Sequence, residues 1–303
     1  MLHCPAQLTV KQLPTRDTSS SHHSPAIALV AVSLALTITA CGSSVKPGSG
    51  SAPGSPAQAS AYVYWANNNT IGRANLNGTG ANQRFITGAR RTRMVAVTAR
   101  YIYWSSDNGT IGRANLNGTG VRPRFITGAS GLVGVAVTSK YVYWANNATG
   151  TIGRANLNGT GVHQHFITGA RQPDGVAVNS KYVYWASDYE IGRANLNGTG
   201  VHQRFITGPS GPSGLAVDSG HIYWANEYTN TIGRADLDGT GAKQSFITGA
   251  DSPDALAIDS DHIYWANFGS GTIGRADLDG TGVNQSFITA HGHPGGVAVA
   301  PGP

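Results

Sequence analysis

The sequence repeats one pattern six times, in which a short run ending in Tyr-Trp is followed by Ile-Gly-Arg-Ala. The repeat accounts for every tryptophan of the 303-residue chain: Trp65, Trp104, Trp144, Trp185, Trp224 and Trp265. Successive tryptophans are spaced 39, 40, 41, 39 and 41 residues apart. A period near 40 built from short strands and glycine-rich turns is typical of a β-propeller blade. We therefore predict an all-β fold, a six-bladed β-propeller.

One repeat contains four strand-like segments. Residues 134–138 and 141–145 combine β-branched, aromatic and small side chains that suit a pleated surface. Residues 151–157 hold the Ile-Gly-Arg-Ala run, and 162–168 form the fourth segment. The Asn-Gly pair at 158–161 supplies the positive φ angles that a tight hairpin needs. Each blade should be a four-stranded antiparallel sheet.

The two ends of the repeat array are offset by one strand. The first repeat begins directly at Tyr62, whereas the last is followed by an extra Gly-Val-Ala-Val run at Gly296–Val299. We expect this C-terminal strand to pair inside the N-terminal blade and close the ring, which removes two exposed sheet edges. The alternative, a row of independent hairpins, is disfavoured because isolated hairpins are marginally stable in water.

The residues before the repeats predict export. Positions 26–40 form an uncharged apolar run that is short for a membrane span but suits a signal-peptide core. The following Ile-Thr-Ala-Cys resembles a bacterial lipobox ending at Cys41, although an ordinary secretory signal is the alternative. The predicted organisation is a lipoprotein signal peptide at 1–40, a lipidated Cys41 with a flexible Gly/Ser/Pro tether at 41–60, and the propeller at 61–303. We expect the protein outside the cytoplasm, lipid-anchored to the membrane of a bacterial cell.

Charge is distributed unevenly along the repeats. Residues 42–205 contain 16 Lys or Arg and 4 Asp or Glu. Residues 206–303 contain 3 Lys or Arg and 10 Asp or Glu. A closed ring would place these groups in opposite sectors. This asymmetry either steers a charged partner, or supports contact between copies, or reflects drift between repeats. Nucleic acid is not an expected partner, because the chain is predicted to be exported and shows no repeated aromatic and basic groove.

The motifs together resemble the YWTD repeat, the low-density-lipoprotein-receptor class B repeat known from six-bladed propellers. The resemblance runs from 62 to 299 and is carried by Tyr-Trp, Ile-Gly-Arg-Ala, Leu-Asp-Gly-Thr and Gly-Leu-Ala-Val-Asp in order. It implies an extracytoplasmic module that binds other macromolecules and has no catalytic residues. The chain departs from the pattern where Thr-Asp should follow Tyr-Trp, since it has Ala-Asn, Ser-Ser or Ala-Ser there, with Ser106 and Ser187 reaching less far than asparagine.

Variation in loop length predicts where a site lies. The spacing from each Ile of Ile-Gly-Arg-Ala to the next Trp is always 33, whereas the spacing from each Trp to its Ile is 6, 7, 8, 6, 8 and 8. All the variation falls in the connection between the second and third strands, on one face of the ring. The loops of this face carry arginines and aromatic residues suited to protein recognition. The candidate binding residues are Arg90, Arg91, Arg93, Arg171, Tyr189, Glu190, Glu227, Tyr228, Phe268, His291 and His293.

Enzymatic functions have weaker signals. A metal on the channel axis needs several inward oxygen or nitrogen ligands. The inner-strand ends offer only Asp218 and Asp259 as acids, in adjacent blades, and turn capping is favoured over a weak cation site as their role. His291 and His293 are candidate ligands or bases, but no nucleophile elbow accompanies them. We therefore predict no cofactor and no metal, and a monomer that binds a protein or glycan. A hydrolase or lyase with a site at the channel mouth, or a surface-assembly unit, is the alternative.

Overall fold

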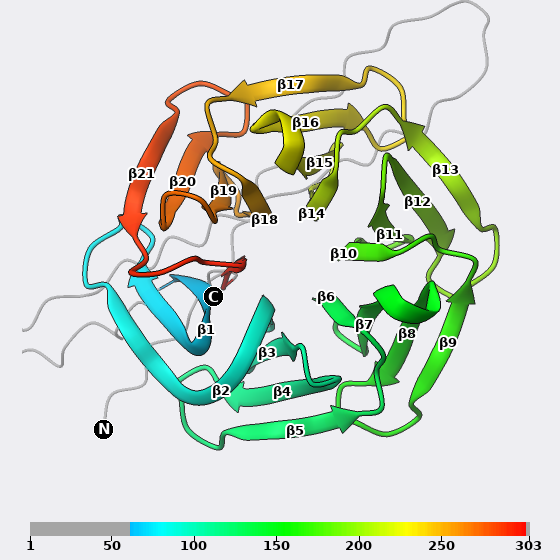
Figure 1. The fold of residues 1–303 in the computed structure, drawn as a ribbon, viewed down its shortest axis with the longest axis horizontal. Helices are drawn as coiled ribbons and strands as arrows, with labels where there is room; N and C mark the ends of the chain where they lie inside the picture. Colours follow the sequence, from blue (N-terminus) through cyan, green and yellow to red (C-terminus); the bar gives the residue numbers. More distant parts are fainter. Residues whose placement is uncertain (1–60, 301–303) are drawn as a thin grey trace, which may run out of the picture. The chain divides into compact units, whose positions relative to one another are not determined.

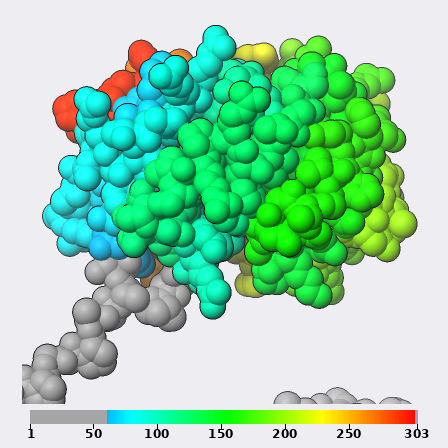
Figure 2. Space-filling model, turned by 90° about the horizontal axis from the view of Figure 1, so that it is seen from below, coloured from blue at the N-terminus to red at the C-terminus, as the bar shows by residue number. Residues whose placement is uncertain are grey.

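The computed structural model describes residues 61–300, which form a ring of β-sheets around a central axis (Figure 1). The fold is an all-β propeller with four-stranded antiparallel blades. Consecutive repeats pack directly against one another at the edge of the ring (Figure 2). Within 61–300 no helix has the length and apolar character needed to cross a membrane. The predicted signal peptide at 1–40, Cys41 and the tether at 41–60 lie outside the described residues.

Four sheets each contain four strands, and every neighbouring pair whose register the structure gives is antiparallel. They are β6 (Leu132–Val137), β7 (Tyr141–Asn146), β8 (Thr151–Asn156) and β9 (His163–Thr168); β10 (Pro173–Val178), β11 (Tyr182–Ser187), β12 (Glu190–Asn195) and β13 (His202–Thr207); β14 (Pro212–Val217), β15 (His221–Asn226), β16 (Thr231–Asp236) and β17 (Lys243–Thr248); β18 (Pro253–Ile258), β19 (His262–Asn267), β20 (Thr272–Asp277) and β21 (Asn284–Thr289). Single 3-10 turns, η1 (Asn147–Thr149) and η2 (Glu227–Thr229), follow β7 and β15.

The remaining strands form one six-stranded sheet, so the described residues contain five sheets rather than the predicted six. Its order is β22 (Gly296–Val299), β1 (Tyr62–Asn75), β2 (Asn82–Val97), β3 (Tyr101–Ser106), β4 (Thr110–Asn115) and β5 (Arg122–Thr127). The first two repeats share this sheet, because β1 and β2 are long strands that run through positions where we expected connections. Arg90, Arg91 and Arg93 were predicted in such a connection and lie within β2 instead.

Thr92 makes a contact that is found where these two repeats join. Asn68 pairs with Thr92, and the Thr92 hydroxyl donates a hydrogen bond to the Asn68 carbonyl at 3.0 Å. The equivalent residue in the other five repeats has no hydroxyl to donate, since it is Leu132, Pro173, Pro212, Pro253 or Pro294. The bridge across Asn68 and Thr92 is therefore specific to this part of the ring.

The predicted ring closure is confirmed. Strand β22 pairs antiparallel with the first half of β1, with Val299 opposite Val63 and Val297 opposite Trp65. The C-terminal strand thus completes the sheet in which the first repeat begins. Strand β1 is therefore paired on its inner side by β22, which is the reason for the offset in the repeats.

The repeat motif is explained by packing between its own strands. Every Trp and the Tyr before it are buried, as in Trp144 and Tyr143. A Cβ on Gly153 would overlap the Trp144 indole, so the glycine of Ile-Gly-Arg-Ala is required by the tryptophan. The Arg154 guanidinium lies between two rings, 4.4 Å from the centre of Tyr141 and 3.9 Å from that of Phe166. The motif is therefore structural in every repeat.

Candidate functional site at the channel mouth

The two ends of the ring differ in their connections. Each inner strand begins beside the end of the second strand of its blade, as shown by the pairs Pro173 with Ser187 and Pro253 with Asn267. The connections that vary in length therefore lie at the same end as the starts of the inner strands. We call this end the loop face. The inner strands end at tight turns on the opposite face.

The axis of the ring is too narrow to hold a ligand. A cavity of about 30 Å³ remains there, and it is lined mainly by small and aliphatic residues of the inner strands, among them Val95, Val135, Val176, Leu215 and Val297. At the loop face, the starts of the inner strands carry the polar residues Arg93, Asp174, Ser213 and Asp254. Any site on the axis therefore lies at this mouth rather than within the channel.

Two adjoining cavities open at the mouth. The first, which we call the acidic cavity, has a volume of about 240 Å³ and is lined by Arg93, Met94, Val133, Asp174, Glu227, Ser252, Asp254 and Phe268. The second, the side cavity, has a volume of about 340 Å³ and includes Arg91, Asp107, Gly292 and His293. Arg93, Asp254 and Phe268 line both. One continuous depression thus occupies the centre of the loop face.

The mouth is built from one sequence position in each repeat. This position lies two residues before the first valine or leucine of the inner-strand core, as Asp174 lies two residues before Val176. In chain order the six residues at this level are Arg93, Val133, Asp174, Ser213, Asp254 and Gly295. Asp174 and Asp254 are each the second residue of an inner strand, directly after proline. These inner strands are β10 and β18. The sequence signal that was missed is this single variable position inside an otherwise uniform strand.

The acidic cavity shifts the titration of both aspartates. Burial raises the pKa of Asp174 to about 6, an effect that Arg93 opposes and Glu227 reinforces. Burial raises the pKa of Asp254 to about 8; Asp174 and Glu227 add to the rise, and Arg93 counteracts it. The Oδ1 atom of Asp174 is buried and has no hydrogen-bond partner in the part of the chain that the structure describes. An unsatisfied carboxylate oxygen of this kind is costly and unusual in a folded protein.

The other walls of the mouth are held in place by pairs. Arg93 Nε lies 2.7 Å from Asp107 Oδ1, and both side chains are about half exposed. The Phe268 ring stacks on His293, with ring centres 4.9 Å apart. The His293 Nδ1 atom is 2.7 Å from the Phe268 carbonyl oxygen. The aromatic wall is therefore fixed by a residue from the connection that leads into β22.

Five predicted binding residues meet at the two cavities: Arg91, Arg93, Glu227, Phe268 and His293. Tyr189 and Tyr228 are on the loop face and are 61% and 69% exposed, outside these cavities. Arg90 and His291 are exposed and also lie outside them.

Arg171 and Glu190 line a separate cavity of about 240 Å³. Glu190, expected in a loop, begins β12 and pairs with Arg204 at 2.7 Å. These two residues therefore do not contribute to the mouth of the channel.

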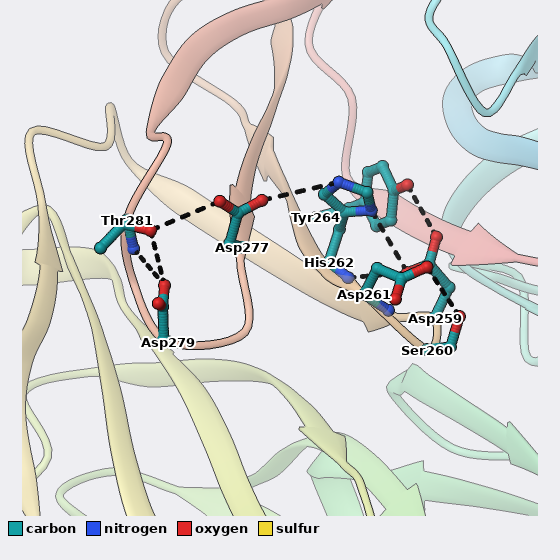
Figure 3. A network of polar contacts seen from close by, with 8 residues as sticks. All are labelled: Asp259, Ser260, Asp261, His262, Tyr264, Asp277, Asp279 and Thr281. Carbon is teal, nitrogen blue, oxygen red and sulfur yellow. Dashed lines mark hydrogen bonds and ion pairs between the residues drawn. The ribbon is translucent and has the colours of Figure 1, made fainter.

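Asp218 and Asp259 are turn residues on the opposite face and do not converge with His293. Figure 3 shows Asp259 accepting hydrogen bonds through Oδ1 from the His262 backbone N–H and through Oδ2 from the Tyr264 hydroxyl. Asp218 makes the same two contacts with His221 and Tyr223. Asp259, Asp261 and His262 have ligand atoms within 4.8 Å of one another, but the Asp259 carboxylate is already committed to its turn. The turn-capping interpretation holds, and a shared cation site on the axis is not formed.

This ring of four-stranded antiparallel blades, with its polar residues gathered at one mouth, defines a β-propeller. No family model matches the chain, and no curated protein matches it. Among solved structures it is similar to the nidogen YWTD propeller from the nidogen–laminin complex, with a TM-score of 0.70 and 19% identity over 79% of this chain and 98% of that one.

Two bacterial enzymes have similar folds. Virginiamycin B lyase from Staphylococcus aureus, in a complex with quinupristin, gives a TM-score of 0.51 and 18% identity over 71% of this chain and 75% of that one. A gluconolactonase from Xanthomonas campestris gives a TM-score of 0.56 and 16% identity over 68% of this chain and 78% of that one. At these identities the similarities establish the fold alone.

Proposed function

We propose that this protein is a binding module that recognises a partner protein through its loop face, with the mouth of the channel at the centre of the contact. The observation that carries the proposal is the depression at the mouth, where the acidic and side cavities meet beside exposed aromatic residues. Tyr228 and Phe268 are 69% and 44% exposed on this face. Aromatic and arginine side chains around a central pocket are the composition of interaction hot spots.

The similarity to the nidogen propeller supports this function, since that structure is a complex of two proteins. A protein partner is preferred over a glycan because the acidic residues and the aromatic wall suit peptide side chains.

We also propose that the six repeats act as six blades, that 1–40 is a signal peptide, and that Cys41 and the tether at 41–60 anchor the propeller outside the cytoplasm. Such an anchor would present the loop face to partners at the cell surface.

The test uses short random peptides displayed on phage and selected on the immobilised full chain. Selected peptides are then measured against a variant combining Arg91→Ala, Tyr189→Ala and Tyr228→Ala. The matched control combines Val162→Ala, Val201→Ala and Val283→Ala, which are 41%, 40% and 44% exposed in turns on the opposite face. We expect the loop-face variant to lose capture with an unchanged Tm and the control to retain it. Retention by the loop-face variant would contradict the proposal.

One observation favours an enzymatic alternative, a hydrolase or lyase. Asp254 combines a pKa of about 8 with a position in an open cavity, which suits a general acid. The folds of a lyase and a gluconolactonase are similar to this one. Turnover of glucono-δ-lactone or 4-nitrophenyl acetate that is abolished by Asp254→Asn would support this alternative, and no turnover of either would leave the binding function preferred.

A further inference from the structure

Resting on the proposed function, we propose that the acidic cavity binds a cationic side chain of the partner protein, the ammonium group of a lysine or the guanidinium group of an arginine. The inference names the chemical group that enters the mouth. It is carried by the charges, the unsatisfied oxygen, the aromatic wall and the apolar lining of this cavity.

The charge of the acidic cavity favours a cation. Asp174, Glu227 and Asp254 line it, and the one basic residue among its lining residues is Arg93. Arg93 is already paired with Asp107 through its Nε atom at 2.7 Å. Three carboxyl groups therefore face a single arginine, and that arginine is also paired with a fourth carboxyl group, that of Asp107. A positively charged ligand would correct this imbalance.

Asp174 supplies a specific acceptor. Asp174 lines the cavity, and its buried Oδ1 atom has no donor among residues 61–300. A buried carboxylate oxygen is stabilised when an N–H group reaches it, and bonds to a charged donor are the strongest of this type. An ammonium or guanidinium group carries several such donors. A cationic ligand in the cavity would thus give the Asp174 carboxyl group a charged partner.

The remaining walls match the rest of a lysine or arginine side chain. The Phe268 ring, fixed by its stack on His293, offers an aromatic face for a cation–π contact. Met94 and Val133 line the same cavity and suit the aliphatic stem of the side chain. A volume of about 240 Å³ is below the usual range for drug-sized ligands and fits one side chain.

The spacing of the carboxylates favours an organic cation over a metal ion. A metal site needs ligand atoms gathered closely around one point. Among the described residues, the one group of three whose ligand atoms all lie within 4.8 Å is Asp259, Asp261 and His262, on the opposite face. The three carboxyl groups of the acidic cavity do not form such a group, which suits a ligand that donates several hydrogen bonds in different directions.

The pH dependence gives an additional signature. The groups that face Asp254 are Asp174, Glu227 and Arg93, with Asp107 and His293 at the side cavity. Because the pKa of Asp254 is raised to about 8, a bound cation would favour its ionised form and release a proton. Binding should therefore strengthen as the pH rises from 6 to 8.

The experiment measures dissociation constants for the full chain by ligand-observed NMR. The probes are the N-acetyl methylamides of lysine, arginine and norleucine, and separately Mg²⁺ and Ca²⁺. We expect the lysine or the arginine probe to bind about tenfold more tightly than the norleucine probe, and Asp174→Asn to weaken it about tenfold. The control Asp188→Asn removes one exposed carboxylate from the loop face outside the acidic cavity and should change nothing. Phe268→Leu is a second variant that should weaken the same probe.

Several results would overturn the inference: equal binding of norleucine, no effect of either Asp174→Asn or Phe268→Leu, or binding of Mg²⁺ or Ca²⁺ that displaces the organic probes. They are distinguishable from failure of the proposed function. If phage-selected peptides depend on Tyr228 but the lysine and arginine probes do not bind, the loop face is an interaction surface without a cation pocket. If no peptide depends on the loop face, the proposed function itself fails.

Discussion

Single residues convert a uniform repeat into a site. The position occupied by Asp174 and Asp254 holds Val133 and Ser213 in other repeats. Ser213 uses its hydroxyl structurally, donating to the Asp254 carbonyl at 2.8 Å. The two aspartates have no comparable structural role, and burial raises the pKa of each. The mouth of the channel is therefore the place where the chain departs from the requirements of the fold.

Replacing Asp254 tests this view through stability. The pKa of Asp254 rises from an ordinary 3.8 to about 8 on folding, so the folded state holds a proton that the unfolded chain releases above about pH 4. Stability should accordingly fall as the pH rises from about 4 to about 8. Asp254→Asn removes this term and should be more stable than wild type at pH 8.5, on the order of a few kcal/mol, with a much smaller difference at pH 5. Thermal unfolding at both pH values measures the difference.

Asp188→Asn provides the control for that experiment, because Asp188 is exposed. Its Tm should follow the wild type at both pH values. A wild-type protein whose stability is flat between pH 5 and 8.5 would show that Asp254 is not held in a desolvated environment.

At the scale of strands and loops, loop length is coupled to a hydrogen-bond network. Three repeats have a spacing of eight from Trp to Ile, and each contains an asparagine after Tyr-Trp-Ala. In one of them Asn146 Nδ2 donates to Thr151 Oγ1 and to the Gln164 carbonyl, and Trp144 Nε1 donates to Gln164 Oε1. The same bonds recur around Asn226 and Asn267.

The repeats with shorter spacing lack the network. In each of them the indole N–H is buried without a partner within the described residues, at Trp65, Trp104 and Trp185. Ser187 Oγ is likewise buried and unpaired in that part of the chain, which agrees with the expectation that serine reaches less far than asparagine. The longer loops thus provide hydrogen-bond partners for buried polar groups that stay unpaired in the repeats with shorter loops.

Asn146→Ala should therefore destabilise the protein. The change leaves the Ser130 N–H and the Gln164 carbonyl without the contacts they make to Asn146 at 3.2 and 2.8 Å. We expect a loss of about 1–3 kcal/mol, measured by urea unfolding. Ser187→Ala is the matched control and should be nearly neutral, because Ser187 Oγ makes no hydrogen bond within 61–300. Equal losses in the two variants would contradict a role for the network.

Gly153→Ala tests the packing of a strand against its neighbour. A Cβ at this position would overlap the Trp144 indole, which is itself fully buried and cannot move aside. We expect a loss of about 3 kcal/mol or more in urea unfolding. The control is Gly220→Ala, where the nearest atom is Asp218 Oδ1 at 3.8 Å and the backbone N–H is retained. A Gly153→Ala variant as stable as the control would show that the motif glycine is not required by the tryptophan.

At the scale of the whole molecule, ring closure was predictable and the number of sheets was not. The offset of the repeats is visible in the sequence because the strand at Gly296–Val299 has no other place in the array. The fusion of two repeats includes the pairing of Thr92 with Asn68, a contact between strands that spacing does not reveal. Loop length indicated the face on which the two cavities open, but only strand register places Asp174 and Asp254 beside Arg93.

Ring closure also assembles the site, because the two ends of the charge distribution meet at the mouth. Strand β22 packs between β2, which carries Arg93, and β18, which carries Asp254. Gly295, just before β22, lies between them, since a Cβ there would be 2.9 Å from the Arg93 carbonyl oxygen and 3.4 Å from Asp254 Oδ2. The basic and acidic halves of the chain therefore contribute one wall each to the same cavity.

Val297→Asp should consequently disrupt both the fold and the site. Val297 is 3% exposed, pairs with Trp65 and belongs to the core, so a buried carboxylate there would release β22 from β1. We expect a loss of at least about 3 kcal/mol in urea unfolding and, in any folded fraction, loss of binding of the cationic probe. Val283→Asp, at a site that is 44% exposed on the outer rim, introduces the same charge and should leave both properties unchanged. A Val297→Asp protein that kept its stability would mean that the ring does not depend on its C-terminal strand. Pairing of β22 would then not be what brings Arg93 and Asp254 together at the mouth.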